Sequence, residues 1–172
     1  MKRKIRIVVI VLLLCIASLP ISASAYVFLG FKKSDNLDLY YHISPKLVDM
    51  GYKQDVLRGF SAWNNYTSKV KFTKEVDITG NVNFDYVDSN YGDAYATHRN
   101  GSSLVSNITI YKSWKGLSPT QRRETTVHEV GHALGLDYTQ PSNNSISVMR
   151  KTGFNDKDWP LKDDLDGINA LY

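Results

Sequence analysis

Two histidines and a glutamate in the stretch TTVHEVGHALGLDYTQ could together hold and use a metal ion. His128 and His132 are four residues apart, so on a helix both imidazoles project from the same face. At this spacing two ring nitrogens can reach one zinc ion about 2.0–2.1 Å away. Glu129 would lie beside the metal, where it can take a proton from zinc-bound water and pass it to the leaving amine.

An ordinary amphipathic helix that happens to carry two histidines is the alternative. Only four histidines occur in the chain, however, and two of them stand in register with a glutamate. The spacing therefore predicts a hydrolytic zinc site.

The third protein ligand decides which kind of zinc hydrolase this is. In one large class it is a glutamate on a later helix, but no glutamate follows Glu129. In the other arrangement a glycine ends the helix and the returning chain supplies the ligand, and Gly135 and Tyr138 occupy these positions. Three interpretations stay open: Tyr138 binds as a phenolate, Asp137 or an outside group completes the shell, or zinc binds weakly or not at all.

Three stretches, HEVGHALGLDY, SVM at 147–149 and DDLDGINALY at the end, resemble the metzincin metalloproteases and, within them, the matrixins. The matrixin pattern is HExxHxxGxxH followed by a methionine turn beneath the zinc. The resemblance implies that His128 and His132 are zinc ligands, that Glu129 is the general base and that Met149 forms the base of the site. The chain departs from the pattern at Tyr138, where the family has histidine.

The elements that must position these residues follow from hydrophobic periodicity. Alternating residues predict strands at 37–43, 70–72, 82–86, 94–98 and 105–111, and helical spacing predicts a helix at 52–66. Capping-box spacing between Ser118 and Gln121, with Pro119 at the first helical position, starts a helix that should end at Gly135. Asp163 and Asp164 open a last helix and are read as helix-end electrostatics.

The connections between the elements indicate the fold class. Strand–helix–strand order favours a parallel pair, and the Asn100-Gly101 turn favours a hairpin, although an ordinary loop is the alternative there. With the resemblance, this predicts an α+β metzincin-like domain at 26–172. It would have a mixed, mostly parallel five-stranded sheet with an antiparallel edge strand, an active-site helix and a C-terminal helix.

Residues 1–25 are predicted to be a secretory signal peptide. Basic residues precede an apolar run at 7–19, and the small residues Ala23-Ser24-Ala25 follow it. An uncleaved anchor is the alternative, but this run is short for a membrane span, which needs about 20 residues, so we expect no stable anchor after cleavage. The four basic residues of the signal account for the net charge of +4, so the rest is close to neutral and a nucleic-acid partner is not expected. Cys15 leaves with the signal, so the mature domain can form no disulfide.

The sequence thus predicts a secreted, extracellular and monomeric zinc endopeptidase that cleaves extended protein or peptide substrates. The resemblance implies that the edge strand at 94–98 pairs with the substrate backbone. A non-catalytic peptide-binding module, or a relic fold with an impaired zinc site, is the alternative. His98 is expected at the surface. The wall of the cleft is expected at 150–161, where Lys151, Phe154 or Trp159 could face inward.

A second metal site is also considered. Calcium sites are common in the family, and an oxygen-rich loop could bind Ca²⁺, although a solvated loop is the alternative. The loop residues are Asp85, Asp88, Asn90 and Asp93.

Overall fold

The computed structural model describes residues 26–99 and 101–172. The predicted signal segment at 1–25 lies outside the described residues, as does Asn100 of the predicted turn. In the part of the chain that is described, no helix is both long and apolar enough to cross a bilayer.

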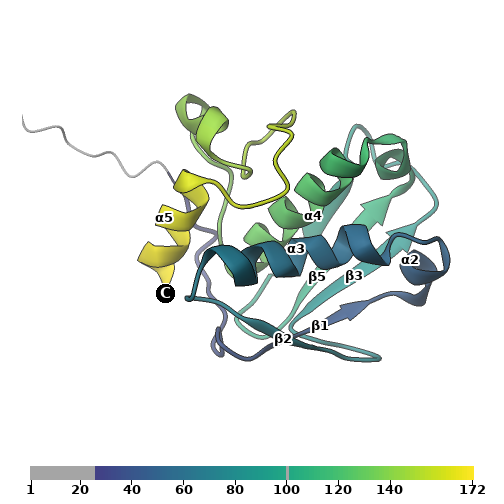
Figure 1. Ribbon diagram of the computed structural model, residues 1–172, viewed down its shortest axis with the longest axis horizontal. Helices are drawn as coiled ribbons and strands as arrows, with labels where there is room; N and C mark the ends of the chain where they lie inside the picture. Colours follow the sequence, from purple (N-terminus) through teal and green to yellow (C-terminus); the bar gives the residue numbers. More distant parts are fainter. Residues whose placement is uncertain (1–25, 100) are drawn as a thin grey trace, which may run out of the picture.

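A five-stranded sheet forms one layer of the domain, in the order β2-β1-β3-β5-β4 (Figure 1). Three neighbouring pairs are parallel, and only β4 runs antiparallel to its neighbour β5. This confirms the predicted mixed sheet with an antiparallel edge strand. The strands are β1 (Leu39–Ile43), β2 (Phe72–Glu75), β3 (Val82–Val87), β4 (Ala96–Arg99) and β5 (Ser106–Tyr111).

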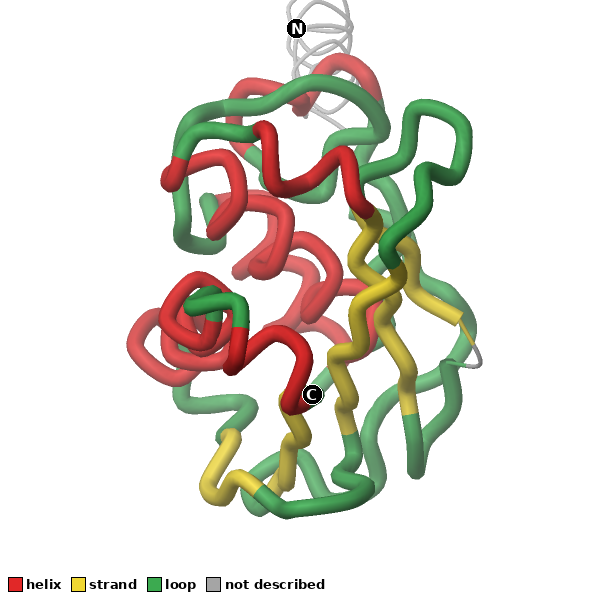
Figure 2. Tube along the Cα trace, turned by 90° about the vertical axis from the view of Figure 1, so that its right-hand side faces the viewer, coloured by secondary structure: helices red, strands yellow, loops and turns green. Residues whose placement is uncertain are grey.

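Two long helices form the second layer and cover one face of this sheet (Figure 2). They are α3 (Lys53–Tyr66) and α4 (Pro119–Leu134). The third, α5 (Lys162–Leu171), closes the chain beside them (Figure 1). The shorter helices are α2 (Pro45–Asp49) and the 3₁₀ turns η1 (Lys112–Gly116) and η2 (Pro141–Ile146).

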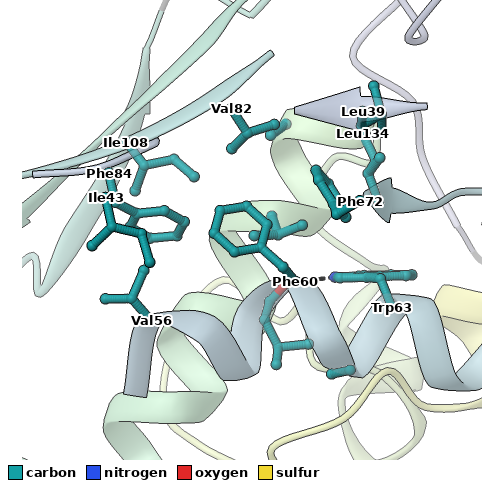
Figure 3. Close-up of a cluster of buried hydrophobic side chains, with 14 of the residues drawn as sticks. Leu39, Ile43, Val56, Phe60, Trp63, Phe72, Val82, Phe84, Ile108 and Leu134 are labelled. Carbon is teal, nitrogen blue, oxygen red and sulfur yellow. Dashed lines mark hydrogen bonds between the residues drawn. The ribbon is translucent and has the colours of Figure 1, made fainter. Parts of the chain in front are cut away.

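The core lies between α3, α4 and the sheet (Figure 3). Phe60 of α3 packs its ring against Phe72 and Phe84 of the sheet, with centroid distances of 4.9 and 5.5 Å. One turn further along, the buried Trp63 donates its indole N–H to the carbonyl of Val127 on α4, at 3.0 Å (Figure 3). Burial of these aromatic rings stabilises the layers, and the indole hydrogen bond fixes where α4 sits along α3.

The structure differs from the predicted elements mainly at their ends. Leu37 was predicted to begin the first strand, but β1 starts at Leu39 because Leu37 is 56% exposed and lies outside the sheet. Val70 is buried yet precedes β2 rather than belonging to it. The short helices α2, η1 and η2 were not predicted, since fewer than two turns give no clear period.

Gly59 sets how closely α3 and α4 approach. A Cβ atom added there would lie 2.9 Å from the backbone oxygen of Thr126 on α4. We therefore expect Gly59→Ala to lower the free energy of unfolding by about 1–3 kcal/mol through overpacking, despite the better helix propensity of alanine. Chemical denaturation measures this value. The matched change Asn65→Ala, at an exposed position of the same helix, should stay within about 0.5 kcal/mol of wild type. Equal stability of both variants would contradict the close approach.

Candidate active site

The helix that carries the two histidines is closed at both ends by its own sequence. Ser118 and Gln121 form a capping box in which each side chain accepts from the other's backbone N–H, at 3.2 and 3.3 Å. Gly135 ends the helix with φ +110°, a left-handed conformation that side chains rarely adopt. The chain therefore turns back sharply one turn after His132, as predicted.

Both imidazoles are held by backbone carbonyls. His128 donates its Nδ1–H to the oxygen of Val148 at 2.7 Å, and His132 donates its own to the oxygen of Leu136 at 2.8 Å. These bonds fix the tautomer and leave both Nε2 lone pairs available to a metal. The ring centroids lie 4.6 Å apart. Burial lowers the pKa of His128 to about 3 and that of His132 to about 4, so both rings are neutral at physiological pH, as ligands must be.

Glu129 lies beside the histidines in an environment that lacks a partner for it. The residue is 5% exposed, and its buried Oε2 has no hydrogen-bond partner among the described residues. Burial raises the pKa of this carboxyl to about 8. A polar oxygen orphaned in this way costs free energy unless something binds to it, so the site fits a bound metal with its water.

Tyr138 stands at the third position of the site. Its ring centroid is 4.9 Å from that of His132 and 5.8 Å from that of His128, so the structure brings the three predicted metal-binding side chains together. Burial, followed by the charges of Glu129 and Asp137, raises the pKa of the phenol, so in the metal-free protein it is neutral.

The turn that carries Tyr138 is braced from both sides. Asp137 donates its backbone N–H to Val27 at 2.8 Å, and Leu29 donates to Gly135 at 2.9 Å, so the segment at 27–29 pairs with the turn. On the other side Thr139 donates its backbone N–H to Met149 at 2.8 Å.

Met149 closes the site from below. Its thioether lies directly against Gly131, at a position in α4 where a Cβ atom would occupy the place of the sulfur. Asp164 fixes the turn before it, because its carboxylate accepts from the Ser147 hydroxyl and from the backbone N–H of Val148 at 2.9 Å. The structure thus places Met149 beneath the histidine helix, as the sequence predicted.

The role predicted for the acidic pair was too narrow. Asp163 and Asp164 lie in the first turn of α5, as predicted, but they are only 4% and 1% exposed and bind groups outside the helix. Asp163 accepts from the hydroxyl of Thr139, and Asp164 also accepts from the backbone N–H of Leu161 at 2.8 Å. Desolvation raises the pKa of Asp164 to about 6 despite these donors. The pair therefore ties α5 to the active-site turns.

A cavity of about 340 Å³ opens next to His128 and Glu129. One wall is the edge of the sheet at 93–96, and the other is the chain at 150–154 that follows Met149. Lys151 and Phe154 line it, as the sequence suggested, but Trp159 does not and instead stacks on Tyr66 at 6.4 Å. A groove between a sheet edge and a wall can hold an extended peptide.

Comparison with known families agrees with this geometry. The sequence model of the matrixins matches residues 32–172, which is most of the chain. The chain belongs to the matrixin family. No curated protein matches this matrixin. Membership places the domain among zinc-dependent metalloproteases, and the α+β architecture with its antiparallel edge strand is the one the resemblance implied.

His98 of this matrixin is not the surface residue that was predicted. Its Nε2 is buried without a hydrogen-bond partner in the described part of the chain, and its ring centroid lies 6.1 Å from that of His132. Burial, followed by the charge of Lys33, lowers the pKa of His98 to about 4. His98 and Ala96 alternate onto the same face of β4, and Ala96 lines the cleft. This alternation in the sequence could have predicted that His98 faces the interior.

The acidic residues of the loop considered for calcium do not gather into a cluster in this matrixin. Within residues 26–99 and 101–172, no three His, Cys, Asp or Glu side chains lie close enough together to hold a metal ion. Asp88 instead accepts from the hydroxyl of Tyr86 at 2.7 Å, and Asp85 accepts from the backbone N–H of Tyr86. By the same finding, Asp137 does not form a three-residue cluster with the two histidines.

The orphaned carboxyl of Glu129 generates a prediction for the metal-free matrixin. Its pKa is about 8 in the folded protein and near 4.5 when unperturbed, so the stability it contributes below pH 4.5 is lost as the pH rises through 8. With a chelator present, Glu129→Gln should match wild type at about pH 5 and be about 1–3 kcal/mol more stable at about pH 9. Chemical denaturation at both values measures this. The control Asp166→Asn, on an exposed ion pair, should show no such pH-dependent gain, and a similar gain in both variants would argue against the orphaned carboxyl.

Proposed function

We propose that this matrixin is a secreted zinc endopeptidase that hydrolyses peptide bonds in extended protein substrates. The observation that carries the proposal is the pairing of two neutral, oriented imidazoles with the buried, unpartnered carboxyl of Glu129. An unpaired carboxyl beside two imidazoles destabilises an ordinary core. A metal ion and its water molecule would bind these groups and use them for catalysis. We further propose that it acts outside the cell as a monomer, with no nucleic-acid partner.

The chain's own groups supply the positioning and the proton transfer. His128, His132 and Tyr138 would hold the zinc ion, which, when bound, polarises the attacking water and stabilises the oxyanion. Glu129 takes the proton of this water as it attacks the peptide carbonyl and then gives it to the leaving amine. A carboxyl whose pKa lies near the working pH can do both, and burial moves Glu129 in this direction.

Tyr138 is proposed as the third ligand. Its ring packs beside both imidazoles, and Asp137 turns its Oδ1 to the backbone N–H of Tyr138 at 2.7 Å. Because burial and neighbouring carboxylates keep the phenol neutral, the metal must displace its proton on binding. A phenolate also donates more electron density than imidazole, which makes the bound water less acidic.

The substrate backbone is proposed to pair with β4. This strand is the edge of the sheet, its inner neighbour is β5, and Ala96 at its start lines the cleft. An extended peptide laid along this edge would become an added strand beside Glu129.

A non-catalytic peptide-binding module that uses the same cleft is the second candidate. The observation that favours it is the neutral and 41% exposed Tyr138, which is a weaker ligand than the histidine of the family pattern. Proteolysis distinguishes the two functions directly.

Purified protein without residues 1–25, supplied with equimolar zinc, should cleave an unstructured protein. Glu129→Ala should lower kcat by at least about 100-fold, because the general base is lost, while peptide binding and folding are retained. Mass spectrometry of the released peptides measures kcat, and circular dichroism checks that the variant is folded. If wild type cleaves nothing under these conditions, the binding module is correct.

Zinc affinity tests the role of Tyr138. Tyr138→Phe removes the hydroxyl alone and should weaken zinc binding by about 10-fold or more, whereas Tyr138→His should strengthen both zinc binding and activity. Competition with a chromophoric chelator measures the dissociation constants. The control Tyr40→Phe alters an exposed phenol on β1 and should leave zinc affinity unchanged. Equal affinity of wild type and Tyr138→Phe would eliminate Tyr138 as a ligand.

A further inference from the structure

The cavity beside the active site contains a carboxylate, Glu124, that the proposed hydrolysis does not use. Glu124 lies one helical turn before His128 on α4 and lines the cavity. It is 2% exposed. Its two oxygens accept from the backbone N–H groups of Asn155, at 2.7 Å, and Lys157, at 3.1 Å. The chain at 155–157, which follows the wall of the cleft, thus fixes this carboxylate in the lining of the cavity.

No positive side chain neutralises this carboxylate. Glu124 takes part in none of the ion pairs in the described part of the chain. The neighbouring Arg123 is occupied by Asp158 at 2.7 Å and Asp55 at 3.7 Å. Burial raises the pKa of Glu124; the backbone N–H groups of Asn155, Lys157 and Asp156 oppose this rise, and the charge of Asp156 adds a smaller one. Backbone N–H groups satisfy both oxygens but carry no full charge, so this buried carboxylate has no cationic partner among the described residues.

Two cations do lie on the cavity wall, and neither supplies the missing charge. Arg150 is turned into its own loop, where its guanidinium donates to the oxygens of Thr152 at 2.8 Å and Phe154 at 2.9 Å. It also donates to the Asn155 side chain at 3.0 Å. Lys151 is exposed at the outer rim, where its ammonium keeps its water.

The cavity also has aromatic walls that suit a long cationic side chain. Tyr95, from the sheet side, and Phe154, from the opposite wall, both line it, and their ring centroids are 5.7 Å apart. Both positions are fixed by backbone bonds: Tyr95 accepts from Tyr111 at 2.9 Å, and Phe154 accepts from Arg150. Rings at this place can pack on an aliphatic stem and attract the ammonium or guanidinium that it carries.

Building on the proposed endopeptidase, we infer that this cavity receives a lysine or arginine side chain of the substrate, next to the cleaved bond. The stem packs against the contacting rings of Tyr95 and Phe154, and the charged end meets Glu124. The substrate class is therefore extended chains that carry a basic residue at one fixed position beside the cleaved bond.

Peptides that differ at a single residue test this inference. Cleavage sites in an unstructured protein, mapped by mass spectrometry on the zinc-loaded wild-type domain, first identify the position beside the bond that is most restricted. At that position lysine is then compared with norleucine, which has a similar stem without the charge. Since a hydrogen bond to a charged group is worth about 10-fold or more, we expect kcat/KM for lysine to exceed that for norleucine by at least about 10-fold.

Substitution of Glu124 tests whether this residue causes the preference for lysine over norleucine. Glu124→Gln keeps the shape of the side chain and should lower the lysine-to-norleucine ratio by about 10-fold, at unchanged zinc content. The control Glu75→Gln removes an acidic residue of β2, which pairs with Lys53 of α3, and should leave the ratio as in wild type. If Glu124→Gln does not fold, the wild-type ratio decides alone.

The outcomes separate this inference from the proposed function. A wild-type protein that cleaves the norleucine peptide as fast as the lysine peptide, or faster, overturns the inference and leaves the endopeptidase intact. A ratio that Glu124→Gln does not change also overturns it. A protein that cleaves none of the peptides refutes the endopeptidase itself.

Discussion

The active site depends on two hydrogen bonds from imidazole to backbone. His128 and His132 can present Nε2 toward a common point only because their Nδ1–H groups are held by Val148 and Leu136. Neither acceptor belongs to α4. Leu136 lies in the turn that follows the helix, and Val148 directly precedes Met149. The chain after Leu134 must therefore return to α4 twice to form the site.

Buried polar contacts hold these two returns in place. The only cysteine of the chain is Cys15, in the predicted signal segment, so no cross-link is possible between described residues. Asp164 accepts from Ser147, Val148 and Leu161, and this set of donors offsets much of the cost of burying a carboxylate. The pKa of about 6 shows that the offset is incomplete. The domain therefore accepts a buried charge in order to fix the position of its methionine turn.

The parts of the site that could be predicted from sequence are those set by local geometry. The helical period places His128 and His132 on one face, and a glycine after a capped helix predicts the sharp return at Gly135. The parallel pairing and the antiparallel edge were predicted from the strand–helix–strand order and the Asn100-Gly101 turn, whereas the order of the strands in the sheet was not. The contact of Asp164 with the methionine turn and the whole role of Glu124 were not predicted, because their partners lie 16 and 31 residues away along the chain and no periodicity marks such pairs. His98 was placed in solvent because residues around 31 and 132 cover it only in the folded state.

The contact between Met149 and Gly131 has a chemical consequence. The sulfur is packed against the helix backbone in a residue that is 2% exposed, and there is no room for an added oxygen. Peroxide would therefore oxidise the partly buried Met50 first and reach this thioether only in molecules whose C-terminal segment has come away from α4. Sulfoxide at position 149 would then be a chemical record of that opening, and the oxidised segment could not repack.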